Sequence, residues 1–86
     1  MKTMKVNVTL RYLKKELVEI RSEQNVDEGC TAGSLCSKII TEHAREEGIN
    51  FTGANIAVLV NGRLATDDTL LKDGDEMKIM PVAAGG

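Results

Sequence analysis

The sequence predicts an α+β domain in which a mixed sheet of four or five strands packs against one helix. Three observations lead to this prediction. Apolar and polar residues alternate strictly over residues 4–10, which is the period of a half-buried strand. One later segment, which follows Thr31, repeats apolar residues at helical spacing. The other apolar runs are short and bounded by turn residues, so the predicted order of elements is β-β-α-β-β-β.

The first predicted strand separates a core face from an outward face. Its core-facing residues are expected to be Met4, Val6, Val8 and Leu10, and its outward residues Lys5, Asn7, Thr9 and Arg11. Residues 12–15 are predicted to turn, and residues 17–21 to return as an antiparallel second strand. The stretch 22–29 is polar apart from Val26, which predicts a loop.

The helix is predicted to start after Thr31, because a threonine hydroxyl can accept a hydrogen bond from an unpaired amide of the first turn. The expected core-facing stripe consists of Leu35, Cys36, Ile39, Ile40 and His43. Gly48 can adopt the left-handed conformation that closes a helix.

Three strands are predicted after the helix. Residues 56–60 form a short branched apolar run, and Asn61-Gly62 is a strong hairpin signal that leads into a return strand over 63–66. Leu70 and Leu71 are expected to anchor a brief helical turn, followed by a turn over 72–75. The last strand covers 76–80, with Met77 and Ile79 inward, Lys78 and Met80 outward, and Pro81 ending it. The first and last strands are expected to lie side by side, parallel, at the centre of the sheet.

Composition excludes several classes of function. The 86 residues form one domain, the net charge is −2, and Tyr12 and Phe51 are the only aromatic residues, so nucleic acid is not an expected partner. No apolar stretch approaches the roughly 18 residues that a membrane helix needs, and no leader pattern opens the chain. We therefore expect a cytoplasmic protein with no membrane partner.

The residue types that often carry catalysis have structural explanations here. Cys36 is predicted to be a small buried hydrophobe, Cys30 an inert loop cysteine, and His43 a structural histidine at the helix edge. The acidic pairs at 67–68 and at 73 and 75 fit turns and lack the spacing of a metal site, so no metal is expected. The chain is therefore not expected to be an enzyme.

The end of the sequence differs from the domain before it. We expect residues 1–81 to form the domain and residues 82–86 to form a flexible tail that ends in Gly85-Gly86. Glycine has no Cβ, so such a tail can enter a narrow channel in a partner enzyme. A carboxylate needs activation before it can transfer an acyl group. The sequence has no glycine-rich nucleotide-binding loop, so an ATP-using partner would have to supply this activation.

The segment VLVNGRLATDDTLLKDGDEMKIMPV, the first strand, the single helix and the terminal Gly-Gly together resemble the ubiquitin-like β-grasp sulfur carriers. This family includes the molybdopterin synthase small subunit and the thiamine-pathway carrier. The resemblance implies that an E1-like adenylyltransferase activates Gly86 and that Gly86 then becomes a sulfur-donating thiocarboxylate. It also implies that no cofactor is bound, that the partner enzyme uses ATP, and that a synthase large subunit or another acceptor enzyme receives the sulfur.

The length and the Pro81-Val82 pair look more like the molybdopterin type than the thiamine type. The sequence departs from that type at Met80, where an aromatic residue often stands, and at the two alanines before Gly85. Two alternatives stay open, a thiamine-pathway carrier and a ubiquitin-like modifier conjugated to lysines through Gly86. A third alternative is a noncovalent β-grasp module whose tail is accidental.

The expected partner-binding surface lies beside the tail. It comprises Leu59, Lys78, Met80, Pro81, Val82, Ala84 and Gly85, with Ala57 as a small neighbour. An exposed patch of methionine and leucine beside a reactive tail is a plausible docking site, because methionine adapts to more than one partner. The alternatives are that Leu59 is a scattered surface residue or is covered by a loop. Arg11 and Arg63 are expected to be solvated surface charges.

Overall fold

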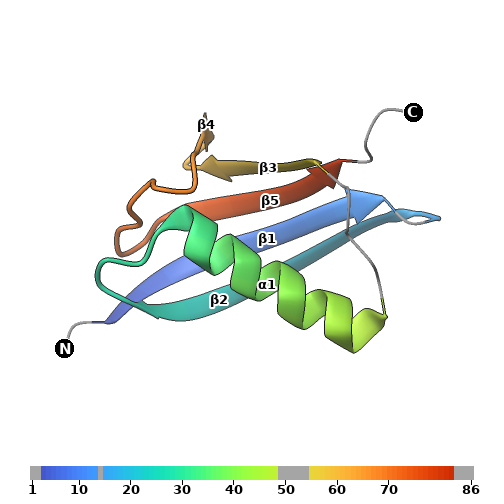
Figure 1. The fold of residues 1–86 in the computed structure, drawn as a ribbon, viewed down its shortest axis with the longest axis horizontal. Coiled ribbons are helices and arrows are strands. Elements are labelled where there is room, and N and C mark those ends of the chain that lie inside the picture. The colour runs from blue at the N-terminus through green and yellow to red at the C-terminus, as the bar shows by residue number, and fades with distance from the viewer. Residues whose placement is uncertain (1–2, 14, 49–54, 83–86) are drawn as a thin grey trace.

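The computed structural model describes residues 3–13, 15–48 and 55–82, and shows one five-stranded sheet with a single helix across one face (Figure 1). In chain order the elements are β1 (Thr3–Leu13), β2 (Leu17–Asp27), α1 (Ala32–Glu47), β3 (Asn55–Val60), β4 (Arg63–Leu64) and β5 (Glu76–Val82). The strand order across the sheet is β2-β1-β5-β3-β4. Only the pair β1–β5 is parallel among these pairings, so the predicted order of elements and the predicted central pair are confirmed.

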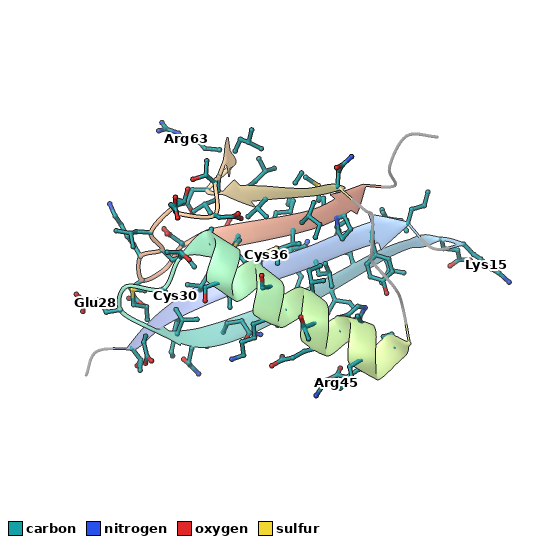
Figure 2. The ribbon with its side chains drawn as sticks, in the orientation of Figure 1. Lys15, Glu28, Cys30, Cys36, Arg45 and Arg63 are labelled. Atoms are coloured by element: carbon teal, nitrogen blue, oxygen red, sulfur yellow. The ribbon has the colours of Figure 1, made fainter. Side chains whose placement is uncertain are left out.

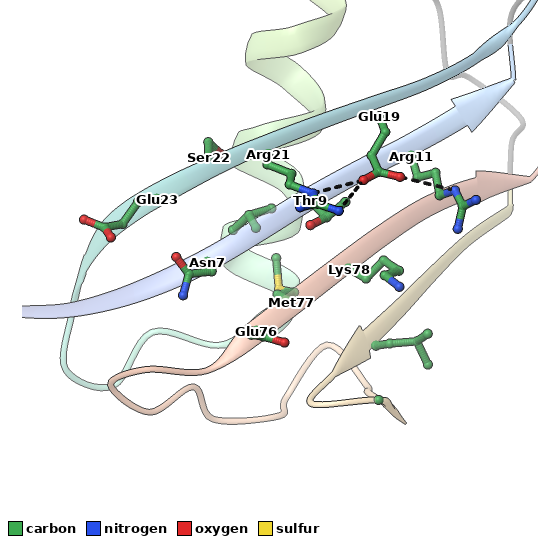
Figure 3. Close-up of a pocket in the computed structure, with 13 residues that line it drawn as sticks. Asn7, Thr9, Arg11, Glu19, Arg21, Ser22, Glu23, Glu76, Met77 and Lys78 are labelled. Carbon is green, nitrogen blue, oxygen red and sulfur yellow. Dashed lines mark hydrogen bonds and ion pairs between the residues drawn. The ribbon is translucent and has the colours of Figure 1, made fainter.

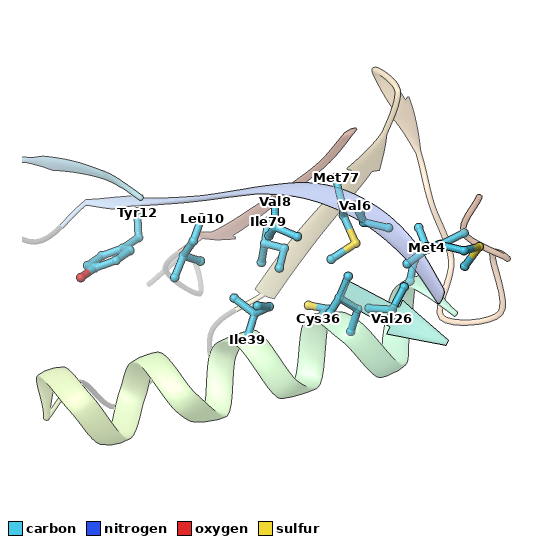
Figure 4. Close-up of a cluster of buried hydrophobic side chains, with 13 residues drawn as sticks. Met4, Val6, Val8, Leu10, Tyr12, Val26, Cys36, Ile39, Met77 and Ile79 are labelled. Carbon is cyan, nitrogen blue, oxygen red and sulfur yellow. The ribbon is translucent and has the colours of Figure 1, made fainter. Parts of the chain in front are cut away.

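The core lies between the sheet and α1, where side chains of β1 and β5 meet the apolar side of the helix (Figure 4). The even-numbered residues of β1 from Met4 to Tyr12 are all buried, as alternation requires. Met77 and Ile79 of β5 are almost completely enclosed. From the helix, the buried contribution consists of Ala32, Leu35, Cys36, Ile39 and His43, which confirms the predicted stripe except that Ile40 is half-buried.

Both ends of α1 are capped as predicted. The Thr31 hydroxyl accepts a hydrogen bond from the Ser34 amide at 3.2 Å. Gly48 adopts a left-handed conformation, with φ 66°, and its amide donates to the Ala44 carbonyl. No helix within the described parts of the chain is long and apolar enough to span a membrane.

The first hairpin is longer than predicted. Tyr12 continues β1 instead of turning, because its ring is buried and its hydroxyl is hydrogen-bonded to Nε2 of His43 at 2.8 Å. Residues 22–27, predicted as a loop, continue β2 and pair with β1 as far as Thr3↔Asp27. Polar residues are accommodated there because β2 is an edge strand whose outer face is open.

The Asn61-Gly62 turn is confirmed, with φ 52° and 79°, but the return strand β4 contains only Arg63 and Leu64. Hydrogen bonds of the Asn61 side chain link this turn to the start of β5. Its Nδ2 donates to Oδ1 of Asp75 at 2.9 Å, and its Oδ1 accepts from the Glu76 amide at 3.0 Å. Oδ2 of Asp75 in turn accepts from the Lys72 amide at 2.8 Å, so the buried carboxylate serves turn geometry as predicted.

The predicted helical turn at Leu70 and Leu71 is wrong. Leu70 forms an isolated bridge with Thr31 and stays 63% exposed, while Leu71 alone is buried. No helical turn forms because the amides of Ala32 and Gly33, at the start of α1, donate hydrogen bonds to the carbonyls of Thr69 and Asp67. These contacts hold the segment extended.

Pro81 does not end the last strand, because β5 continues to Val82 and pairs Pro81 with Ile56. The Asp75 carbonyl accepts from the Asn7 amide of β1, whereas the Glu76 carbonyl accepts from Asn61 on the β3 side. Odd-numbered residues of β5 therefore direct their backbone groups toward β1. The pairing with β1 stops at Ile79, and the ring nitrogen of Pro81 faces that side, so Pro81 removes no donor from the pairing with β3.

Candidate functional site

The face of the sheet opposite α1 holds the predicted partner-binding residues. One row of side chains crosses all five strands on this face and is set by the register. Leu64 of β4 is opposite Leu59 of β3, and Leu59 is opposite Lys78 of β5. Lys78 is opposite Thr9 of β1, which in turn is opposite Arg21 of β2. The row therefore runs from an apolar end to a charged end.

Four residues of this row, Leu59, Lys78, Thr9 and Arg21, line a shallow depression of about 820 Å³ (Figure 3). Its lining is mostly polar and comes from every strand except β4, together with the turn at Gly62. It consists of Asn7, Val8, Thr9, Arg11, Glu19, Arg21, Ser22, Glu23, Leu59, Gly62, Glu76, Met77 and Lys78. A surface this open is suited to a protein partner rather than to an enclosed small molecule.

The charges on β1 and β2 are largely paired with each other. Glu19 accepts from Nε of Arg21 at 3.0 Å and lies 2.9 Å from its Nη2, while its other oxygen lies 3.8 Å from Nε of Arg11. Glu23 lies 3.9 Å from Nζ of Lys5. Arg11 was predicted to be a solvated charge, and the structure instead places it in this ion-pair group.

Lys78 differs from these cations. Its side chain is exposed at the centre of the row, and none of the described carboxylates lies within 4.0 Å of its ammonium nitrogen. An unpaired ammonium group beside apolar side chains can accept a carboxylate from a partner without breaking an existing ion pair. This makes Lys78 the charged centre of the candidate site.

Leu59 and Met80 lie on the predicted face, but they are half-buried rather than fully exposed. Neighbouring strands flank both residues, with Met80 opposite Ala57 and Leu59 between Lys78 and Leu64. The exposed apolar residue of this patch is Leu64, which is 79% exposed and was not predicted as part of the site. The signal was present in the sequence, because a two-residue Asn61-Gly62 turn fixes Leu59 opposite Leu64. We call Leu59, Leu64, Lys78 and Met80 the β3–β5 patch.

β5 carries the chain along this patch toward its last residues. Pro81 is half-buried next to Met80, and Val82 is the last residue of the strand. Ala83 to Gly86, with the predicted Ala84, Gly85 and Gly86, lie outside the described residues. The β3–β5 patch therefore includes two residues of β5, the strand whose last residue, Val82, precedes Ala83 to Gly86 in the sequence.

The two cysteines lie on the helix side of the sheet, away from this face (Figure 2). Cys36 is buried, as predicted, and its burial, with a smaller effect of Asp67, raises the pKa of the thiol. Cys30 is half-buried, with its Sγ 3.5 Å from the Thr31 carbonyl. His43 is hydrogen-bonded to Tyr12 in the core, which confirms its structural role. No cluster of metal-binding side chains occurs within 3–13, 15–48 and 55–82.

A sequence profile described as the ThiS family matches residues 4–86, which is almost the whole chain and includes Gly85-Gly86. The chain belongs to the ThiS family. This ThiS-family protein therefore has the ubiquitin-like sulfur-carrier fold, and proteins of this type are generally small, non-catalytic partners of E1-like enzymes and synthase large subunits. Among curated proteins, none gives a significant match to the chain.

Solved structures agree with this assignment. The putative molybdopterin converting factor, subunit 1, from Pyrococcus furiosus is 26% identical, with a TM-score of 0.57, and the match covers 90% of this chain and 98% of that one. The HVO 2177 protein of Haloferax volcanii is 25% identical, with a TM-score of 0.57, over 98% of this chain and 88% of that one. A ubiquitin from Caldiarchaeum subterraneum is 17% identical, with a TM-score of 0.58, over 99% and 100% of the two chains, and this likeness concerns the fold.

Proposed function

We propose that this ThiS-family protein carries sulfur as a thiocarboxylate on Gly86 and delivers it to an acceptor enzyme. The observation that carries the proposal is the match to a sulfur-carrier family that extends through Gly85-Gly86. The position of the β3–β5 patch is consistent with it, because β5 carries Lys78 and Met80 and ends at Val82, after which only Ala83 to Gly86 follow in the given sequence. In this proposal, a partner that docks on the patch also receives the reactive end.

The chemistry requires a partner that uses ATP. A carboxylate oxygen of Gly86 attacks the α-phosphorus of ATP, and pyrophosphate leaves. Hydrosulfide supplied by the partner then attacks the activated carbonyl carbon, AMP leaves, and loss of the sulfur-bound proton gives the thiocarboxylate. In this proposal the partner supplies the activating chemistry and this protein presents the carboxylate, while His43 is hydrogen-bonded to Tyr12 in the core and Cys36 is buried.

The proposed acceptor is a large subunit of the molybdopterin-synthase type. The support is the 26% identity to a protein named as a putative molybdopterin converting factor, subunit 1, together with the Pro81-Val82 pair before the tail. A thiamine-type acceptor is the alternative, and conjugation to protein lysines is a further one. All three require the same activated Gly86.

Intact mass spectrometry of protein isolated from its native host tests the proposal. The expected result is a population heavier by the exchange of one carboxyl oxygen for sulfur. Deletion of Gly85 and Gly86 should abolish this species. Covalent ladders on other proteins without the sulfur-exchanged species would indicate the modifier alternative, and the absence of both products would contradict a carrier function. Incubating the thiocarboxylate with candidate acceptor enzymes then identifies the pathway.

The patch is tested with substitutions that leave the tail intact. Lys78→Glu and Leu64→Ser should weaken binding to the E1-like partner, because one reverses the unpaired charge and the other removes exposed apolar area. Lys38→Glu, on the exposed side of α1, and Leu70→Ser, at another exposed leucine, are the matched controls. Equal effects of the patch variants and the controls would show that partners dock elsewhere.

A further inference from the structure

β2 has the longest free edge among the strands that the structure describes. It contains eleven residues and pairs only with β1 within residues 3–13, 15–48 and 55–82, whereas the opposite edge strand, β4, contains two. A long unpaired edge offers a row of backbone donors and acceptors to another strand. The question is which strand fits it.

The directions of the backbone groups follow from the neighbouring pairs. The amide of Gly74 donates to the Lys5 carbonyl at 2.8 Å, and the amide of Asn7 donates to the Asp75 carbonyl at 2.9 Å. Odd-numbered residues of β1 therefore face β5, and even-numbered residues face β2. Since Val8 is opposite Ser22, the even-numbered residues of β2 bond to β1. The odd-numbered residues of β2 consequently direct their amides and carbonyls toward the free edge.

We propose that two copies of this chain associate through their β2 edges, antiparallel and centred on Ser22, so that the two five-stranded sheets become one. In this register every residue of β2, from Leu17 to Asp27, pairs with β2 of the other copy. Arg21 of each copy lies opposite Glu23 of the other, which gives two cross-strand ion pairs related by symmetry. On the helix side, Val18 lies opposite Val26. No pair in the register places like charges opposite each other.

Competing registers are less favourable. Centring the pair on Arg21 or on Glu23 places two like charges directly opposite each other, which destabilises an antiparallel pair. Registers that place an odd-numbered residue opposite an even-numbered one would set the apolar side of one strand against the polar side of the other. Centring on Ile20 also avoids like charges, but it leaves the end of β2 near Val26 unpaired. A second copy is favoured over an unrelated extended peptide because the sequence of β2 is self-complementary about Ser22.

On the helix side of the sheet, the surface next to the β2 edge also leaves room for a second strand. Ile20 points toward the helix side, as its pairing with Leu10 requires, yet 37% of it is exposed. α1 crosses the sheet obliquely, and its C-terminal turns extend past the β2 edge (Figure 1). A strand added to β2 would therefore gain a covering surface on its helix side. The β3–β5 patch lies toward the opposite edge of the sheet and stays accessible.

Sedimentation velocity on the full chain, over a concentration series up to the millimolar range, tests the association. Arg21→Glu and Glu23→Arg should each lower the association constant by about tenfold, because two symmetric ion pairs become repulsive. The combined variant should restore association. Asp68→Arg, a comparable charge change between β4 and β5, should have no effect. Circular dichroism confirms that each variant is folded.

A second variant probes the backbone. Glu23→Pro removes an amide that faces the free edge and no amide that bonds to β1, so the chain should remain folded and lose association. A chain that stays monomeric throughout the series overturns the proposal. So does an association that Arg21→Glu leaves unchanged. If Glu23→Arg has no effect, or if the combined variant fails to restore association, the Ser22 register is wrong.

Discussion

The hydroxyl of Tyr12 lies 2.8 Å from Nε2 of His43, and this hydrogen bond joins the end of β1 to the last turns of α1. The two rings also meet edge to face, with centroids 5.4 Å apart. Both residues are buried. Because the residues are 31 positions apart in sequence, the contact fixes where the helix lies across the sheet.

Tyr12→Phe should lower the free energy of unfolding by about 1–2 kcal/mol, because it removes the hydroxyl and leaves a buried imidazole nitrogen without this partner. Urea denaturation measures the change. A double-mutant cycle with His43→Leu separates the pair interaction from loss of packing. Additive effects of the two substitutions would show that the pair contributes no coupling.

The ionisation of Tyr12 should oppose folding at alkaline pH. Burial, and to a smaller extent the charge of Glu47, raises the pKa of Tyr12 above 10.0. The folded state therefore holds its proton more tightly than the unfolded state, so this contribution to stability is complete below the unfolded pKa and is lost as the pH rises through the folded pKa. Tyr12 is the only tyrosine, so tyrosinate absorbance reports it directly. Equal midpoints in native buffer and in urea would contradict the prediction.

The two thiols should differ in reactivity. Cys36 is buried with a raised pKa, whereas Cys30 is half-buried, so Cys36 should react with a disulfide reagent on the order of tenfold or more slowly. Cys30→Ser leaves only Cys36, and Cys36→Ser leaves only Cys30, so the rate for each thiol can be measured separately. The difference should disappear in denaturant. Equal rates in the folded protein would show that Cys36 is accessible.

Asn61→Asp should destabilise the protein by about 2–4 kcal/mol, because the amide nitrogen that donates to Asp75 becomes a carboxylate oxygen beside a buried carboxylate. Asn61→Gly is the matched control. It accepts the positive φ and removes the side-chain hydrogen bonds, at an expected cost of about 1–2 kcal/mol. Urea denaturation measures the two losses, and equal losses for Asn61→Asp and Asn61→Gly would show that charge repulsion is not the cause.

Gly33→Ala should destabilise the protein although alanine favours helices. A Cβ at Gly33 would lie 2.8 Å from Cα of Asp67 and 2.9 Å from its carbonyl oxygen, so the backbone there must move. The expected loss is about 1–3 kcal/mol. Ser37→Ala, at an exposed position of the same helix, should instead be neutral or slightly stabilising. Thermal unfolding of both variants compares them, and a gain in stability for Gly33→Ala would refute the predicted clash.

Local patterns in the sequence predicted most of the elements, because each depends on residues close in the chain. The alternation in β1 determines its core face, Thr31 and Gly48 determine the ends of α1, and Asn61-Gly62 determines the hairpin turn. The face of β5 that carries Lys78 follows from the same period of two. The family resemblance likewise depended on the sequence, including its terminal Gly-Gly.

Features that depend on distant partners were decided by the tertiary structure. β2 extends to Asp27 because it pairs with β1 up to that residue. Tyr12 stays in β1 because its hydroxyl is hydrogen-bonded to His43. Pro81 remains in β5 because its ring nitrogen faces the β1 side, where the pairing has ended at Ile79, and the pairing with β3 continues. Leu64 joins the β3–β5 patch only through its register with Leu59.

The sequence by itself determined the type of each long element, which face of it is apolar, and the residues proposed for the sulfur chemistry. Local conformation and hydrophobic period are properties of neighbouring residues, and they are visible in the chain. The tertiary structure alone decided how far the strands extend, which cations are already paired, and which strand edge is free. Those outcomes depend on hydrogen bonds and charges between segments that meet only after folding.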